Sequence, residues 1–168
     1  MSEAKTAKPP FDNLRLLWIA AFVIVVDQIT KYFVGKSLVL YDSIPVISHF
    51  NLVRLHNTGA AFSMLNTAPA AMFIVLSVAV SIGILWWLRT NRHGQLLNAL
   101  AFVFVLGGAL GNAIDRATRG YVLDFIQFFV GEWHFAAFNV ADMAITLGAG
   151  LMILDLVIQS LRRPTAAA

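Results

Sequence analysis

Apolar residues gather into four long runs that are separated by more polar stretches. The runs cover about residues 14–34, 70–88, 96–114 and 140–161. Each run comes close to or exceeds the roughly 20 residues that a helix needs to cross the hydrocarbon core of a bilayer. The pattern predicts one membrane domain with four spanning helices and with flexible tails at 1–13 and 162–168. Four spans place both ends of the chain on the same side of the membrane.

The two longer connections carry patterns of their own. Residues 35–69 contain "SIPVISHFNLVRLHNTGAAFSML", whose partial alternation with intervening turn residues predicts a few short strands. Residues 115–139 contain "RGYVLDFIQFFVGEWHFAAF", which is aromatic and apolar enough to dip into the membrane interface. The predicted fold is an all-α integral membrane protein with a small β-rich subdomain in the first connection and a short interfacial segment in the second.

Composition supports the membrane prediction. The chain of 168 residues is 59% apolar and only 12% charged, whereas a soluble domain is about half apolar and roughly a quarter charged. We therefore exclude an ordinary soluble domain. The chain has no cysteine, which excludes disulfides, thiolate zinc sites and a cysteine nucleophile.

The distribution of basic residues predicts the orientation. Seven Lys and Arg residues lie in the N-terminal tail and the first residues after it (up to Arg15), the 89–95 link and the C-terminal tail, against four in the two longer connections. Short cytoplasmic segments are enriched in Lys and Arg. Both termini are therefore predicted to be cytoplasmic, and the connections 35–69 and 115–139 to face outward.

Ionisable side chains in membrane spans are costly unless they are paired, and they are candidates for function. Asp27 and Lys31 are four residues apart in the first run, which permits a salt bridge on one helix face; a structural pair is favoured over a catalytic role. In "GGALGNAIDR" (107–116), the glycines predict close helix packing. Asp115 and Arg116 are expected to form an ion pair at the interface, and Asn112 shares a helix face with Arg116.

Two aspartates at the outer ends of spans suggest hydrolytic chemistry. Asp124 has apolar neighbours on both sides, and Asp142 follows a candidate N-cap, Asn139, by three residues. If the third and fourth spans pack together, both carboxylates reach the same depth, and one of them keeps a proton. The ionised carboxylate can then take a proton from water while the protonated one polarises an amide carbonyl. The sequence leaves open which aspartate plays which part.

Other chemistries have weaker support. The four histidines show no H-E-x-x-H spacing, so no metal site is expected. A Ser–Lys dyad of Ser63 and Lys31 is conceivable, although Lys31 already has Asp27 as a local partner. No phosphate-cradling glycine loop or nucleic-acid patch is present. Two classes remain as alternatives: a proton-coupled transporter using Asp27, Lys31, Asp142 and Asp155, and a non-catalytic scaffold built on the glycine faces.

Over about residues 14–161 the chain resembles the lipoprotein signal peptidases, the bacterial type II signal peptidases. The matching segments, in chain order, are "DQITK" (27–31), "NTGAAFS" (57–63), "GGALGNAIDR" (107–116), "VLDFI" (122–126) and "FNVADMAI" (138–145). The resemblance implies an aspartyl endopeptidase that cleaves prolipoproteins N-terminal to a diacylglyceryl-modified cysteine. It also implies residence in the bacterial inner membrane, with the β-rich subdomain and the active site on the periplasmic face.

The resemblance further assigns residues. Asp124 and Asp142 match the catalytic dyad of the family. The positions that contact substrate or support the dyad are Asn57, Asn112, Arg116 and Asn139, and those that are structural are Asp27, Lys31, Gly59 and Asp115. No metal or organic cofactor is implied. The expected partners are the prolipoprotein substrate, membrane lipids and the cyclic peptide inhibitor globomycin, with no nucleic acid, and the enzyme is expected to be a monomer.

Overall fold

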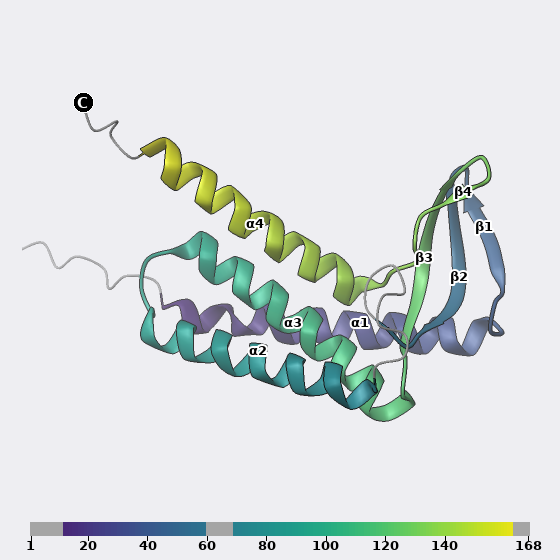
Figure 1. Ribbon diagram of the computed structural model, residues 1–168, viewed down its shortest axis with the longest axis horizontal. Coiled ribbons are helices and arrows are strands. Elements are labelled where there is room, and N and C mark those ends of the chain that lie inside the picture. Colours follow the sequence, from purple (N-terminus) through teal and green to yellow (C-terminus); the bar gives the residue numbers. More distant parts are fainter. Residues whose placement is uncertain (1–11, 60–68, 163–168) are drawn as a thin grey trace, which may run out of the picture.

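Four long helices lie side by side, with a small sheet across one end (Figure 1). The computed structural model describes residues 12–59 and 69–162. The helices are α1 (Leu17–Ser37), α2 (Ala70–Thr90), α3 (Leu96–Arg119) and α4 (Val140–Arg162), and a short 3-10 helix, η1 (Asn13–Leu16), leads into α1. The predicted set of four long apolar helices is confirmed. The predicted tails lie almost wholly outside the described residues.

The helices bury little of their surface against one another. In the most apolar window of α4 only 17% of residues are buried inside the protein, and in that of α2 only 22%, whereas α3 reaches 50%. Large apolar side chains such as Phe22, Ile82 and Leu156 are exposed along the helices. A helix that is apolar on all sides and still exposed is suited to lipid rather than water. The protein is therefore a membrane protein in which α3 is the central helix.

Glycines let α3 approach its neighbours on two sides, as the sequence predicts. A Cβ at Gly107 would lie 2.8 Å from Val23 Cβ of α1, and a Cβ at Gly108 would lie 2.3 Å from the Ala141 carbonyl oxygen of α4. Both distances are shorter than a side chain tolerates, so only glycine permits these crossings. The start of α4 consequently lies against the end of α3, which is the arrangement that the two-aspartate hypothesis requires.

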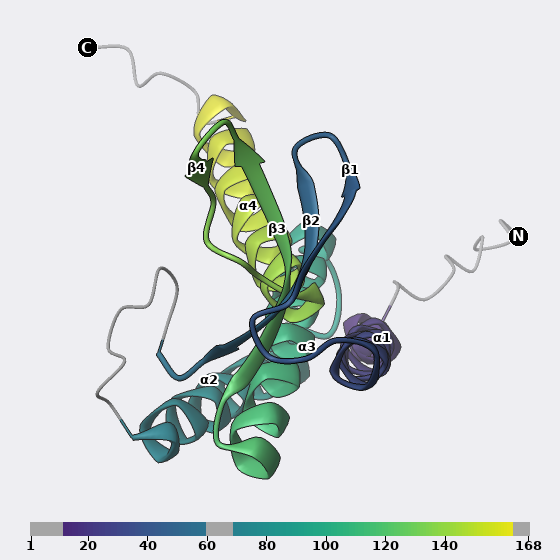
Figure 2. The same ribbon diagram turned by 90° about the vertical axis from the view of Figure 1, so that its right-hand side faces the viewer.

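Both longer connections contribute strands to one antiparallel sheet. The strands are β1 (Ser43–Ile47), β2 (Phe50–Asn57), β3 (Val122–Val130) and β4 (Trp133–His134), in the order β1-β2-β3-β4. Figure 2 shows β3 running alongside β2, and the register places Asp124 opposite Leu55.

The β-rich subdomain predicted for the first connection therefore extends into the second, and the interfacial placement of 115–139 stays a prediction. The run "VLDFIQFFV" forms the longest strand of the sheet. Its β-branched and aromatic residues suit a strand, and pairing with it satisfies backbone groups along β2 that would otherwise form an open edge. The same aromatic residues account for the prediction of an interfacial segment.

The opposite end of the bundle is closed by the α2–α3 link. Asn13, which is 1% exposed, donates from Nδ2 to the carbonyl oxygens of Asn91 (2.7 Å) and Gly94 (2.8 Å). Asp12 forms an ion pair with Arg92. The beginning of α1 is thereby attached to the link between α2 and α3, far from the sheet. We call the end that carries the sheet the sheet end.

Candidate active site

The strand β3 carries Asp124 into the junction between the sheet and the helices. Its neighbours Leu123 and Phe125 are buried against Val34 and Leu38 at the end of α1. Because this apolar cluster fixes the strand on both sides of Asp124, the carboxylate occupies a defined place. Asp124 is only 3% exposed, and a buried carboxylate requires hydrogen-bond partners.

Asp142 is held at the first turn of α4 by reciprocal capping. The Asn139 side-chain oxygen Oδ1 accepts a hydrogen bond from the Asp142 backbone N–H at 3.0 Å. In return, Asp142 Oδ2 accepts from the Asn139 backbone N–H at 3.2 Å. This is the pattern of a capping box, with aspartate in place of glutamate. The predicted N-cap at Asn139 is confirmed, and capping orients the carboxylate of Asp142.

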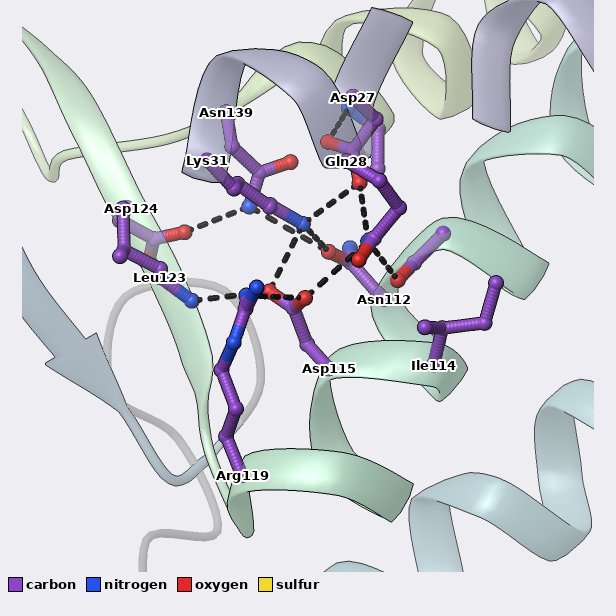
Figure 3. A network of polar contacts seen from close by, with 12 residues as sticks. Asp27, Gln28, Lys31, Asn112, Ile114, Asp115, Arg119, Leu123, Asp124 and Asn139 are labelled. Carbon is purple, nitrogen blue, oxygen red and sulfur yellow. Dashed lines mark hydrogen bonds and ion pairs between the residues drawn. The ribbon is translucent and has the colours of Figure 1, made fainter. Parts of the chain in front are cut away.

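Three asparagine side chains donate hydrogen bonds to the two aspartates, and two of them, Asn139 and Asn112, connect the pair. Asn139 Nδ2 donates to Asp124 Oδ1 (2.7 Å) and also approaches Asn112 Oδ1 (3.3 Å). Asn112 Nδ2 donates to Asp142 Oδ1 at 2.8 Å, and Asn57 Nδ2 donates to Asp124 Oδ2 at 3.0 Å. Every carboxylate oxygen of the pair therefore accepts a hydrogen bond. Figure 3 shows Asn139 reaching from Asp124 toward Asn112.

The surroundings of Asp124 favour its protonated form. Burial, followed by the negative charge of Asp142, raises the pKa of Asp124 from 3.8 to about 7. The hydrogen bonds from Asn57 and Asn139 and the charge of Lys31 act in the opposite direction. Near neutral pH the pair can thus hold one proton and one negative charge, which is the combination that acid–base hydrolysis needs.

Arg116 has a different partner from the one predicted. Arg116 Nη2 donates to the Gly59 carbonyl oxygen at 2.6 Å, and the guanidinium lies 4.6 Å from the ring centroid of Phe73. Gly59 in turn donates its N–H to Asn57 Oδ1 at 3.0 Å. The predicted ion pair of Arg116 with Asp115 is not formed, because consecutive residues of a helix point in directions about 100° apart. Arg116 instead supports the backbone beside Asn57.

Asp115 belongs to a buried ion cluster that lies beside the aspartates (Figure 3). The predicted salt bridge between Lys31 Nζ and Asp27 Oδ2 is present at 2.8 Å. Lys31 also pairs with Asp115 Oδ2 at 3.0 Å, and Arg119 pairs with Asp115 Oδ1 at 2.7 Å. Gln28 Nε2 bridges Asp27 and Asp115 at 3.1 Å to each.

Sequence reasoning missed Gln28 and Arg119. Arg119 could have been found, since it follows Asp115 by four residues on one helix. Gln28 carries no such signal, because its contacts cross from α1 to α3.

The remaining candidates lie elsewhere or outside the described residues. Asp155 accepts hydrogen bonds from Asn98 and Gln159 and takes no part in the cluster. Ser63, together with residues 60–63 of the "NTGAAFS" segment, lies outside the described residues. Among the residues that the structure describes, no three His, Asp or Glu side chains are grouped as a metal site requires.

Comparisons with known proteins agree on one family. The family model of signal peptidase (SPase) II matches residues 19–158. A lipoprotein signal peptidase of Alteromonas mediterranea is 47% identical over 147 residues, covering 86% of this chain and 81% of the relative. The lipoprotein signal peptidase of Pasteurella multocida is 46% identical over 146 residues, covering 85% and 88%.

Two solved structures share the fold. Both are described as bacterial membrane enzymes whose structures were obtained by the in meso method, at 2.3 Å and 1.9 Å resolution. The first has a TM-score of 0.84 and 29% identity, covering 95% of this chain and 97% of the other. The second has a TM-score of 0.78 and 31% identity, covering 89% and 97%.

Proposed function

The chain belongs to the signal peptidase II family, and we propose that it works as an aspartyl endopeptidase in the membrane, with Asp124 and Asp142 as its catalytic residues. Membership of the family implies a bacterial membrane protease that removes signal peptides from prolipoproteins. The aspartyl mechanism is supported by one observation above all. Two aspartates from separate elements, the buried Asp124 of β3 and Asp142 of α4, are both bound by Asn139, whose Nδ2 donates to the Asp124 carboxylate and whose Oδ1 accepts from the Asp142 backbone N–H.

The surroundings of the two aspartates favour different roles. Asp142 lies at the N-terminal turn of α4, where the helix dipole favours an ionised carboxylate. Asp124, with its pKa raised to about 7, is the better proton donor. We assign Asp142 as the general base and Asp124 as the general acid, in a pair that titrates as a unit.

The proposed reaction balances its protons over two steps. A water molecule gives one proton to Asp142 and attacks the scissile carbonyl carbon, while Asp124 passes its proton to the carbonyl oxygen. The tetrahedral intermediate then collapses and the C–N bond breaks. Asp142 protonates the leaving amine, and Asp124 recovers its proton as the new carboxyl group forms. Both residues return to their starting states, so no metal or organic cofactor enters the scheme.

We propose that the surrounding polar residues position substrate and dyad. Asn139 and Asn112 hold the two carboxylates, and Asn57 holds Asp124 while it binds the Gly59 backbone. Arg116 stabilises the same backbone through the Gly59 carbonyl. These residues are close enough to the pair to donate hydrogen bonds to a substrate peptide bound at it.

An apolar groove lies next to Asp142 and suits a lipid-modified substrate. The groove has a volume of about 330 Å³ and is lined by Ile47, Phe50, Ile126, Phe128, Phe138 and Met143. Its lining residues Phe138 and Met143 flank the turn that carries Asn139 and Asp142, so the groove lies near the dyad. We propose that the diacylglyceryl group of the substrate cysteine occupies this groove, which holds the peptide bond N-terminal to that cysteine at the aspartates.

The proposed setting is the bacterial inner membrane, with both termini in the cytoplasm and the sheet end in the periplasm. This orientation rests on the basic residues in the tails and the 89–95 link. Globomycin, a cyclic peptide, is proposed to compete with substrate at the aspartates.

The test uses purified protein in liposomes and a prolipoprotein with and without its diacylglyceryl group. Mass spectrometry of the product should show a new N-terminus at the modified cysteine, only for the lipidated substrate, and globomycin should prevent its formation. Equal cleavage of the unlipidated substrate, or cleavage at another bond, would contradict the proposal.

A further inference from the structure

The strongest unexplained feature of the molecule is the complete burial of Lys31. Its side chain is 0% exposed inside the sheet end of a membrane bundle, where a charge is expensive. A helix-stabilising pair with Asp27 would need only one of the three N–H groups of the ammonium. The structure uses all three, with acceptors at Asp27 Oδ2 (2.8 Å), Asp115 Oδ2 (3.0 Å) and Asn112 Oδ1 (3.0 Å).

The third acceptor links the ion cluster to the dyad. Asn112 receives the Lys31 ammonium on its oxygen and presents its Nδ2 to Asp142 Oδ1 at 2.8 Å. An asparagine amide can rotate by 180° and exchange its oxygen and nitrogen positions. An ammonium has no acceptor, so a rotated Asn112 would direct its NH₂ group at Lys31 and its oxygen at the carboxylate of Asp142. Both contacts would be repulsive.

We propose that Lys31 is a positioning residue for catalysis: it fixes the side-chain amide of Asn112 in the orientation that donates a hydrogen bond to Asp142. This inference rests on the proposed function of Asp142. It assigns to Lys31 a task beyond the structural role that the sequence favours. The route runs from α1 through α3 to α4, and no atom of Lys31 contacts the substrate in this scheme.

Asn139 depends on the same orientation. Asn112 Oδ1 also accepts from Asn139 Nδ2 at 3.3 Å, and the same nitrogen donates to Asp124 Oδ1 at 2.7 Å. Rotation of the Asn112 amide would place two NH₂ groups against each other. Lys31 therefore acts on both aspartates, on Asp142 through Asn112 and on Asp124 through Asn112 and Asn139.

The cluster is electrically balanced, which allows a controlled test. Asp27 and Asp115 are matched by Lys31 and Arg119, and all four groups are linked by ion pairs. One acid and one base can be removed together without leaving a net charge. The charged groups that face Lys31 and the dyad from the packed elements are Asp27 and Lys36 on α1, Arg54 on β2, Asp115, Arg116 and Arg119 on α3, Asp124 on β3 and Asp142 on α4.

The test variant is Asp27→Asn combined with Lys31→Met. The asparagine keeps an oxygen for the Ala141 N–H, which donates to Asp27 Oδ1 at 2.9 Å. The methionine fills the space of the lysine and removes the ammonium from Asn112 and from Asp115, which keeps Arg119 and Gln28 as partners. The matched control is Asp115→Asn combined with Arg119→Gln, which removes one acid and one base from the same cluster but leaves Lys31 on Asn112. Its asparagine keeps an acceptor for the Leu123 N–H.

Cleavage of a diacylglyceryl-modified prolipoprotein is followed across pH for both variants, with thermal unfolding as the check on folding. The test variant should lower kcat roughly 10-fold to 100-fold with KM within about twofold, as expected for a misaligned base. The acidic limb of its kcat profile should move to higher pH by up to about one unit, because the hydrogen bond from Asn112 to Asp142 is lost and the loss of the Lys31 charge outweighs that of the Asp27 charge. The kcat of the control should stay within about threefold of the wild-type value, and the acidic limb of its kcat profile should not move.

The pH profile separates positioning from folding, because a smaller folded fraction lowers the rate without moving the limb. Equal losses in both variants with unmoved limbs would overturn the proposal. If the test variant does not fold, Asp27→Asn with Lys31→Gln takes its place, and the same comparison with the control decides. Asp142→Asn is run in parallel: its activity would refute the proposed function, whereas its inactivity beside an active test variant would refute this inference alone.

Discussion

Asn139 combines a helix cap with a bridge between the Asp124 carboxylate and Asn112, and substitutions can separate the two tasks. Asn139→Ala removes both. The cap contributes about 1 kcal/mol to the free energy of unfolding. The bond from Nδ2 to the buried carboxylate of Asp124 contributes roughly 1.5–3 kcal/mol. Asn139→Ala should therefore destabilise the protein by about 2–4 kcal/mol and abolish most of its cleavage activity.

Asn139→Ser is the matched control. Serine is a good N-cap, so its hydroxyl oxygen can accept the Asp142 N–H that Asn139 Oδ1 accepts now. It is too short to replace the amide that reaches Asp124. The serine variant should recover about 1 kcal/mol of stability relative to alanine, measured by thermal unfolding in detergent, and should cleave lipidated substrate about as slowly as the alanine variant.

The pH dependence of cleavage by the two Asn139 variants gives an independent test. The Asn139 hydrogen bond lowers the pKa of Asp124, which stands at about 7. Removing the bond raises that pKa further. Because Asp124 acts as an acid in the proposed scheme, the basic limb of kcat should move to higher pH in both variants. Wild-type cleavage rates in Asn139→Ser would refute the bridging role, and a basic limb moved to lower pH would refute the acid role of Asp124.

Two further predictions concern stability. The pKa of Asp124 is about 7 in the folded protein against 3.8 in the reference state. This carboxyl therefore contributes stability that is fully present below about pH 4 and is lost as the pH rises through about 7, up to roughly 4 kcal/mol over the full range. Unfolding in detergent at pH 5 and pH 8 should show the loss, and Asp124→Asn should remove this dependence. Gly108→Ala should destabilise the protein by about 1–3 kcal/mol or more, because its Cβ would lie 2.3 Å from the Ala141 carbonyl oxygen. Gly83→Ala, whose Cβ would have no atom within 4 Å, should be close to neutral. Equal unfolding temperatures for the two variants would contradict the packing argument.

Local and compositional signals were sufficient for much of the fold. The four helices follow from the length of the apolar runs, because a bilayer demands that length. The Asp27–Lys31 pair and the cap at Asn139 follow from spacing within one helix, where geometry is set by the helix itself. The proximity of Asp124 and Asp142 needed one assumption about packing, and the glycines of α3 made that assumption reasonable.

Contacts between distant segments could not be predicted from the sequence. The pairing of β2 with β3 joins residues about 70 positions apart, such as Leu55 and Asp124, and the aromatic character of β3 suits a membrane interface as well as a strand. Asp115 was assigned to its neighbour Arg116, although its partners are Lys31 on another helix and Arg119 one turn on. The link from Lys31 to Asn112 also depends on how two helices are placed, which periodicity alone does not specify.

The central claim is that Asp124 and Asp142 together hydrolyse the peptide bond, and single isosteric substitutions test it most directly. Asp124→Asn and Asp142→Asn are reconstituted in liposomes beside the wild type, and cleavage of a diacylglyceryl-modified prolipoprotein is followed by gel shift after thermal unfolding has verified the fold. Both folded variants are expected to lose cleavage. Retained turnover in either one would contradict a two-aspartate mechanism.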